Sequence, residues 1–114
     1  MAKQQVIERD VTLLKGGDHN STYRFKNDDQ TPKDTTGWTL TRTIRKNFPN
    51  GAELDTLETD GTRIINTPGN GQFNIKITAA EIEAYGWTSA EFRDVLDYGD
   101  GTTQVLRIGR IKVV

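Results

Sequence analysis

The only histidine of the chain, His19, is the first residue to test for chemistry, because imidazole changes its charge near neutral pH. It lies in the run Gly16–Asn20, whose glycines and polar residues are typical of a solvated turn. No nucleophile or orienting acid is spaced around it as a catalytic triad requires. One histidine also excludes a metal site built on a histidine pair. We therefore interpret His19 as an exposed loop residue and expect no enzyme activity, no metal and no cofactor.

Carboxylates are plentiful and gather in three groups, at residues 28–34, 53–60 and 94–100. A glycosidase needs two of them facing each other across a cleft, roughly 5–10 Å apart. Here the acids fall in expected turns and on strand exteriors, and a chain this short offers no cleft for a sugar. The run Asp97–Gly101 lacks the ligand spacing and final glutamate of an EF-hand loop. We interpret these acids as solvated turn residues.

A basic and aromatic stretch holds Arg42, Arg45 and Lys46 between Trp38 and Phe48. In proteins that bind single-stranded nucleic acid, aromatic residues stack on the bases and basic residues bind the phosphates. However, charges on a strand fall on both faces, and the chain carries 15 basic against 16 acidic residues. Since nucleic-acid affinity comes mainly from phosphate neutralisation, we expect no nucleic-acid partner.

The remaining aromatic residues leave two readings open. Trp38 begins an expected strand and is interpreted as a core residue. Trp87 follows Gly86 and is either a plug in the core or an exposed interface anchor. If Trp87, Tyr85 and Tyr98 were exposed together, they would stack on sugar rings, so a carbohydrate-binding module for cell-surface glycans is the competing class of function.

The second half of the chain predicts strand, short helix and hairpin. Residues 71–77 alternate apolar and polar side chains as a half-buried strand does. Thr78 then begins a helix, about 78–85, with Glu81 completing a capping box and Gly86 as its stop. Two apolar runs, 92–98 and 103–113, are joined by an Asp-Gly turn, which is a strong hairpin signal.

The last strand changes face along its length. Leu106 and Ile108 share one parity, whereas Ile111 and Val113 share the other. Such a switch needs an extra residue, and we expect a β-bulge at Gly109-Arg110.

The first half reads as short strands between turns rich in Gly, Pro, Asn and Asp. The expected strands are 6–15, 21–26, 38–46, 52–57 and 62–66. Together with the second half they predict an all-β fold, an antiparallel two-sheet β-sandwich of about seven strands whose one helix caps an open end. We expect a single domain over residues 1–114, in which residues 1–5 are a flexible or partner-bound tail.

Composition agrees with a thin core and with folding in the cytoplasm. Hydrophobic residues make up 33% of the 114 residues, and mean hydropathy is −0.67. No run reaches the roughly 18–20 apolar residues that cross a bilayer, and the first ten residues lack the apolar stretch of a signal peptide. The chain has no cysteine. We expect no membrane partner.

The order of several short motifs resembles small virion proteins of tailed bacteriophages. In the first half these are a Gly-Gly-Asp turn at 16–18, an aromatic strand at 23–25, and Asp-Thr-Thr-Gly-Trp at 34–38 before a strand ending in Ile44-Arg45. In the second half they are Gly-Gln-Phe at 71–73 and Thr-Ala-Ala-Glu at 78–81, followed by Phe-Arg-Asp-Val at 92–95 and an Asp-Gly hairpin. The last strand adds Leu106, Gly109, Ile111 and Val113 at the family's spacing. The similarity covers about residues 14–114.

This resemblance is to immunoglobulin-like or baseplate-type β-sandwich modules, including the N-terminal modules of upper baseplate and receptor-binding proteins. It implies a non-enzymatic part of the virion, in the tail, baseplate or tail fibre, that docks into a symmetric assembly with other virion proteins and copies of itself. Because the sequence ends with its last strand, a capsid decoration, head-fibre or connector protein is the alternative. The contact residues expected from the sequence are Val6, Ile7, Arg45, Phe48, Tyr85 and Trp87.

Overall fold

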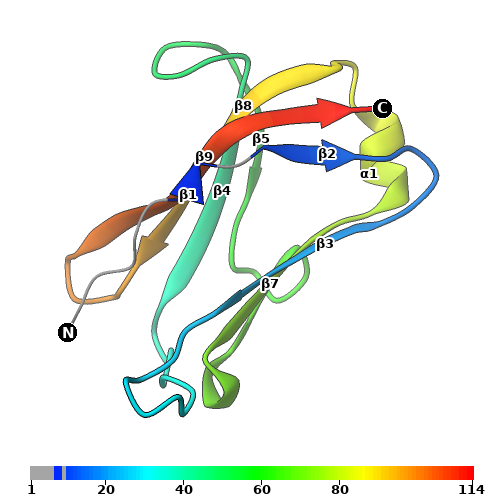
Figure 1. Cartoon of the computed structure of the whole chain (residues 1–114). Coiled ribbons are helices and arrows are strands. Elements are labelled where there is room, and N and C mark those ends of the chain that lie inside the picture. Colours follow the sequence, from blue (N-terminus) through cyan, green and yellow to red (C-terminus); the bar gives the residue numbers. More distant parts are fainter. Residues whose placement is uncertain (1–6, 9) are drawn as a thin grey trace.

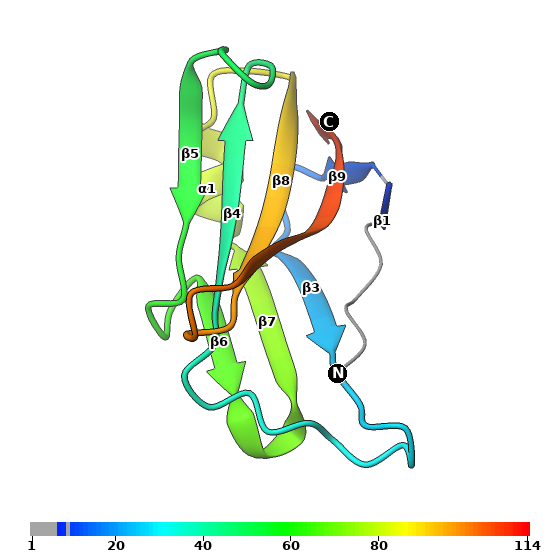
Figure 2. The same ribbon diagram turned by 90° about the vertical axis from the view of Figure 1, so that its left-hand side faces the viewer.

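The computed structural model describes residues 7, 8 and 10–114, which form two β-sheets packed face to face (Figure 1). The strands of the large sheet run in the order β1-β9-β8-β4-β5, with β2 also paired to β9, and those of the small sheet run β3-β7-β6. Figure 2 looks onto the outer face of the large sheet, with β6, β7 and β3 behind it. The all-β two-sheet sandwich expected from the sequence is confirmed.

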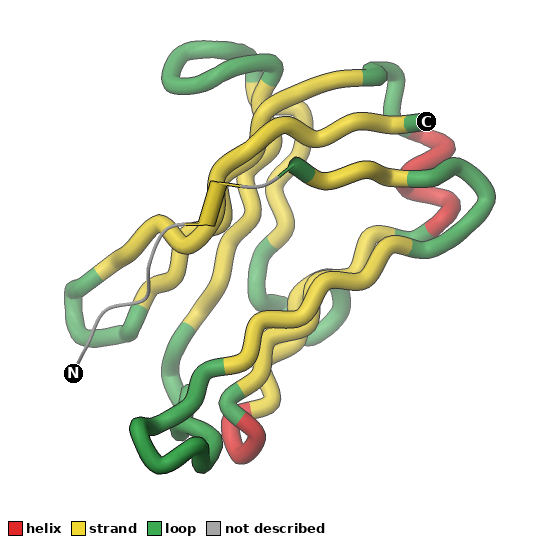
Figure 3. Tube along the Cα trace, viewed as in Figure 1, coloured by secondary structure: helices red, strands yellow, loops and turns green. Residues whose placement is uncertain are grey.

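The described part of the chain contains nine strands, one α-helix and one 3₁₀ turn, as Figure 3 shows by colour. The strands are β1 Ile7–Glu8, β2 Val11–Leu13, β3 His19–Arg24, β4 Thr39–Arg45, β5 Glu53–Leu57, β6 Ile64–Thr67, β7 Gln72–Ile77, β8 Ser89–Asp97 and β9 Thr103–Val113. The helix α1 is Ala79–Ala84, and the 3₁₀ turn η1 is Pro68–Asn70.

Two of the nine strands correct the expected antiparallel pairing. The single strand expected over 6–15 is divided into β1 and β2, and both run parallel to β9, with Ile7 opposite Arg107 and Val11 opposite Ile111. A parallel pair cannot be closed by a tight hairpin and needs a long connection. That condition is met here because nearly the whole chain lies between the two partners.

The helix begins as the sequence predicts but ends in a different cap. The Thr78 hydroxyl accepts a hydrogen bond from the Glu81 amide, and the Glu81 carboxylate accepts one from the Thr78 amide, so the capping box is confirmed. The last helical residue is Ala84 and the extended Tyr85 is the C-cap, so the helix ends directly before Gly86 as expected, but Gly86 does not adopt a left-handed conformation. An extended residue leaves the helix without the left-handed conformation that favours glycine. The side chain of Ile82 packs the helix against the core.

The bulge in the last strand is present, but three residues before the expected place. Val95 pairs with Val105 and Asp94 with Arg107, so Leu106 is the extra residue. Gly109 keeps regular pairing with Phe92. The extra residue thus falls within the first apolar pair, so Leu106 faces the core while Ile108 pairs with the outward Arg93, and the two do not share a face as their parity indicated.

The core fills the space between the sheets. It combines alternate residues of β4, β8 and β9 with those of β6 and β7, and α1 closes the end where β7 stops and β8 starts. Its fully buried side chains include Leu40, Ile44, Phe92, Leu96, Ile64, Phe73, Ile75, Ile77 and Ile82. Of the two isoleucines that start β6, Ile64 is buried and Ile65 is 39% exposed, which settles their orientation.

Candidate functional site

The contact residues expected from the sequence lie in separate parts of the surface. Val6 falls outside the described residues, and Ile7 is part of β1 at the edge of the large sheet. Arg45 and Phe48 lie together near the end of β4, and Tyr85 and Trp87 lie together after α1. All four side chains of these two pairs are half-buried. The described members of this set therefore fall in three regions of the chain: β1, the corner after β4 and the segment after α1.

Phe48 is the centre of the first pair. Two guanidinium groups lie over its ring, Arg93 at 4.4 Å and Arg45 at 5.7 Å from the ring centroid. The corner that carries it is fixed by two hydrogen bonds, from the Phe48 amide to Glu91 Oε1 (2.7 Å) and from Arg45 to the Gly51 carbonyl (3.1 Å). Cations over an aromatic face are attracted by its quadrupole, so both arginines are pre-positioned for an acidic or carbonyl-rich partner.

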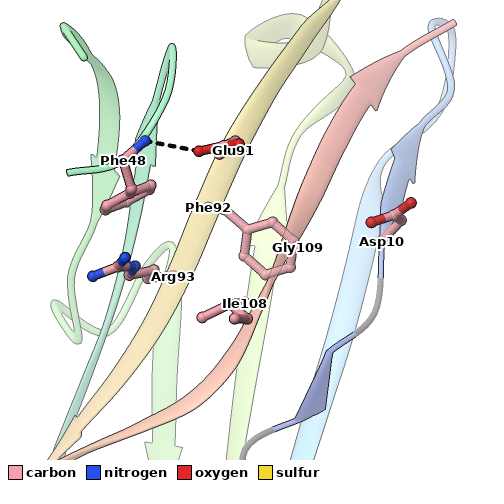
Figure 4. Close-up of a pocket in the computed structure, with 7 residues that line it drawn as sticks. All are labelled: Asp10, Phe48, Glu91, Phe92, Arg93, Ile108 and Gly109. Carbon is pink, nitrogen blue, oxygen red and sulfur yellow. Dashed lines mark hydrogen bonds between the residues drawn. The ribbon is translucent and has the colours of Figure 1, made fainter. Parts of the chain in front are cut away.

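A pocket of about 490 Å³ adjoins this cluster on the outer face of the large sheet (Figure 4). In the figure Phe48 and Arg93 lie on one side of it and Asp10 on the other, with Ile108 and Gly109 between them. Its lining residues are Asp10, Phe48, Glu91, Phe92, Arg93, Ile108 and Gly109. Both acids already accept backbone hydrogen bonds, Glu91 from Phe48 and Asp10 from Arg110 (2.9 Å). The guanidinium of Arg93 is thus the group best placed to bind an incoming carboxylate.

The second pair belongs to a charged network that joins β5, the start of β6 and α1. The rings of Tyr85 and Trp87 stack at 4.8 Å, and the Tyr85 hydroxyl donates to Asp55 Oδ2 (2.6 Å). Arg63 forms ion pairs with Asp55 (2.6 Å) and Glu81 (2.7 Å). Burial alone would raise the pKa of Asp55, but the hydrogen bonds from Arg63 and Tyr85 outweigh it and lower that pKa. Burial together with Asp55 raises the pKa of Tyr85. This network fixes the ring pair in place.

Tyr98, the third aromatic residue of the proposed sugar platform, lies elsewhere. It is in the turn between β8 and β9, where its ring meets Trp38 edge-on at 4.8 Å and its hydroxyl donates to Gln104 (2.8 Å). In Figure 1 this hairpin lies at the opposite end of the sandwich from α1. The structure therefore does not bring Tyr85, Trp87 and Tyr98 together into one platform. Trp38 packs against the core as the sequence predicts, and Trp87 is partly buried against it too.

A buried ion pair lies between the sheets. Arg42 and Asp94 both have 0% exposed side chains and are joined by two hydrogen bonds of 2.7 and 2.8 Å. Tyr23 of the small sheet donates to the same carboxylate (2.6 Å). Burial and the adjacent Asp94 raise the pKa of Tyr23. Burial by itself lowers the pKa of Arg42, but the contacts with Asp94 outweigh it and raise that pKa.

Asp94 therefore corrects the interpretation of the third acidic group as solvated turn residues. The signal was present in the parity of β8, in which Ala90, Phe92, Asp94 and Leu96 are all buried. A carboxylate on the apolar face of a strand implies a buried cation opposite it, and Arg42 interrupts the apolar face of β4 in the same way. The two residues are directly paired in the sheet register.

His19 also differs from its expected setting. It is the first residue of β3, is only partly exposed, and makes a hydrogen bond of 2.9 Å to Ser21. Burial lowers its pKa, and the positive charges of Arg42 and Arg107 lower it further. The interpretation as an exposed turn histidine was wrong, because β3 begins two residues earlier than the sequence predicts. Its ring nitrogen is paired with the Ser21 hydroxyl, and both charges that act on it are positive.

Several acids of the three groups do act as turn residues. Asp34, Asp60, Asp97 and Asp100 each accept a hydrogen bond from a backbone amide two residues on, in the pattern of an Asx-turn. Among the described residues no cluster of three or more histidine, cysteine or acidic side chains is arranged to hold a metal ion.

Comparison with known proteins finds no family model that matches the chain and no curated protein similar to it. The described helices include none that is both long and apolar enough to cross a membrane.

Proposed function

We propose that the protein is a non-enzymatic structural component of a tailed-bacteriophage virion, a tail, baseplate or tail-fibre part that docks into a symmetric assembly. The observation that carries this proposal is the distribution of candidate contact residues over three regions of one β scaffold. A subunit of an assembly must touch several neighbours at once, whereas an enzyme or carrier gathers its key residues around one concave site. The order of sequence motifs, which resembles small virion proteins, supports the same function.

The state of the ionisable groups is a second support. Arg42 and Asp94 neutralise each other inside the sandwich while Tyr23 donates to the same carboxylate, and Asp55 is held by Arg63 and Tyr85. Groups tied in this way stabilise and orient the sheets, and a catalytic group must be free to exchange protons or electrons with a substrate. The polar side chains of the scaffold therefore fix its shape, as we expect of a structural subunit.

Edge strands provide a further means of docking. β5 is the last strand of the large sheet, and β3 and β6 are the two outer strands of the small one. Each presents backbone N–H and C=O groups along one side, with which a strand from a neighbouring subunit can pair. The short β1 pairs with β9 in this manner within the chain itself.

The test is quantitative mass spectrometry of purified particles made from the genome that encodes the chain, together with immunogold electron microscopy. We expect a fixed copy number per particle that withstands a high-salt wash, and labelling at one location in the virion. Absence of the protein from mature particles would refute the proposal. Labelling of the head would favour the alternative of a capsid decoration, head-fibre or connector protein.

A glycan-binding assay followed by tryptophan fluorescence distinguishes a structural subunit from a carbohydrate-binding module. A saturable response that disappears in Trp87→Ala would favour a carbohydrate-binding module, and no response is expected from an assembly part. A matched control is Trp38→Phe, because Trp38 lies with Tyr98 at the other end of the molecule.

A further inference from the structure

The outer face of the large sheet carries a symmetric pattern of side chains along its central strand. On β8 the outward residues Glu91, Arg93, Val95 and Asp97 alternate with four buried ones. Arg93 and Asp97 lie two residues on either side of Val95, each about 7 Å from it along the strand. A positive and a negative charge are thus placed at equal distances from an apolar residue on the same face.

The neighbouring strands extend this pattern sideways. Val95 pairs with Thr41 of β4 and Val105 of β9, and in the next row Arg93 pairs with Thr43 and Ile108. The two valines and the isoleucine are half-buried on a face that no other described element covers. Together with the ring of Phe48 they form an apolar patch in the middle of the sheet, bounded by charges.

Arg93 and Asp97 differ in the contacts that they already make within the chain. The Arg93 guanidinium stacks on Phe48, and among the described residues it makes no ion pair. The exposed Asp97 uses one carboxylate oxygen to accept the Gly99 amide (2.8 Å), which leaves the other oxygen open to solvent. Each charge can therefore gain a partner of opposite sign without losing a bond in its own chain.

We propose that this face is an interface between two copies of the chain, related by a two-fold axis that passes over Val95. A two-fold axis in the plane of the interface and across the strands lays β8 antiparallel over β8 of the second copy. Val95 then meets its own equivalent, and Arg93 meets Asp97 of the second copy, twice by symmetry. An isologous interface requires a surface that is complementary to itself in this way. Packed sheets lie about 10 Å apart, a distance that arginine and aspartate side chains span together.

The adjoining row of the face supports the same arrangement. Arg45, Glu91 and Arg110 lie side by side across β4, β8 and β9, one row beyond Arg93. The rotation sets this row, and the pocket beside it, opposite the turn between β8 and β9 of the second copy. That turn holds Asp100, an exposed acid, between two glycines. Two arginines thus face an acid, and the pocket of about 490 Å³ accepts the tip of the turn.

This inference rests on the proposed function, because a symmetric assembly is what gives self-association a purpose. It is tested by sedimentation equilibrium of the purified full chain, from low micromolar to millimolar concentration. We expect a reversible monomer–dimer equilibrium that weakens as salt is raised, since exposed charges are screened. Arg93→Asp and Asp97→Arg should each raise the dimer dissociation constant at least about tenfold, because every substitution acts at two symmetric places.

The decisive variant combines the two reversals. In R93D/D97R the pairs are re-formed with exchanged signs and net charge is unchanged, so the dissociation constant should return to within about threefold of the original. Val95→Lys sets two like charges at the axis and should abolish the dimer without touching the ion pairs. The matched control is Arg24→Asp, on the exposed outer side of β3, which should leave association unchanged. Circular dichroism checks that each variant is folded.

A wild-type protein that stays monomeric throughout the series, or a double reversal no better than the single ones, would overturn the interface. These outcomes are independent of the particle test. A monomer in solution that is still found in virions overturns this interface alone, whereas a dimer absent from virions overturns the proposed function alone.

Discussion

Replacing Asp94 by asparagine should remove a large part of the stability of the protein. The two side chains are almost equal in shape, but the substitution leaves the guanidinium of Arg42 charged and unpaired at a position with 0% exposure. Breaking a buried ion pair from one side costs about 3–5 kcal/mol. A domain of this size has a free energy of unfolding of about 5–15 kcal/mol, so D94N keeps a folded state only if the wild type lies well above the lower limit.

The assay is equilibrium unfolding in urea followed by the fluorescence of Trp38 and Trp87. With an m-value of about 1–3 kcal/mol/M, the expected loss lowers the midpoint by more than about 1 M. A milder variant, Tyr23→Phe, removes only the hydrogen bond of 2.6 Å to Asp94 and should cost about 1.5–3 kcal/mol, as bonds to charged groups do. Asp28→Asn changes an exposed acid in the same way and should alter stability by less than about 0.5 kcal/mol.

A triple variant decides whether the cost comes from the unpaired charge. In Y23F/R42M/D94L all three polar groups are replaced by apolar ones of similar volume, so that no buried charge or hydroxyl is left without a partner. Such replacements are often neutral or stabilising, and the triple variant should be more stable than D94N. If D94N lost less than about 1 kcal/mol, or if the triple variant were as unstable as D94N, the reasoning from desolvation would be refuted.

Three smaller perturbations test other parts of the fold. The lowered pKa of His19 means that the unfolded chain binds a proton more readily than the folded one, so stability should fall as pH drops below about 6.5 towards the folded pKa. In His19→Gln this part of the pH dependence should disappear from thermal midpoints measured between about pH 8 and pH 5, and an unchanged profile would contradict the prediction. Thr78→Ala removes the hydroxyl that caps α1 and should cost about 1 kcal/mol in urea unfolding, against less than about 0.5 kcal/mol for Thr88→Ala at an exposed loop position. Gly71→Ala adds a methyl group at φ 59°, with its Cβ only 2.6 Å from the Phe25 carbonyl oxygen, so it should cost more than about 1 kcal/mol, and a neutral result would refute the close approach.

Much of the fold could be predicted because local signals and global packing agree. The Asp-Gly turn gives the β8–β9 hairpin, the strict alternation of residues 72–77 gives β7, and Thr78 with Glu81 gives the start of α1. Each of these depends on residues close in sequence, whose geometry the turn or cap fixes. The strand partner of β1 and β2 could not be predicted in the same way, since it lies about a hundred residues away in the sequence. No nearby residue indicates whether the pairing is parallel or antiparallel.

The site was predicted less completely, and for a physical reason. Arg45 and Phe48 were named from the sequence and do lie together, because they are only three positions apart in the chain. Arg93, the closer cation to Phe48, was missed, since it reaches the ring through the pairing of β8 with β4. Asp94 was misread because a count of acids in a segment ignores the side of the strand on which each one lies. Parity within β8 distinguishes Asp94 from Asp97, and would have placed one inside and one outside.

The polar contacts inside the sandwich connect its stability to its proposed role. Apolar packing holds two sheets together but is not directional, so by itself it permits small sliding of one sheet over the other. Tyr23 ties β3 to Asp94 of β8, and Asn66 of β6 bonds to Thr35 and Trp38 beside the start of β4 (2.7–3.3 Å). Bonds of this kind have fixed partners and lengths, and therefore select one position of the small sheet against the large one.

That selection acts on the outer face as well. β8 carries Asp94 inward and Arg93 outward on successive residues, so a shift of the buried pair would move the row of Arg93, Val95 and Asp97 with it. Because Arg42 and Asp94 are directly paired between β4 and β8, their ion pair favours this strand register, and a slip of one residue would turn Arg93, Val95 and Asp97 to the opposite face. A buried ion pair that adds little net stability is then retained for the accuracy it gives to the surface. A subunit that docks against the same neighbour at every position of a symmetric assembly needs surface residues whose positions are well fixed.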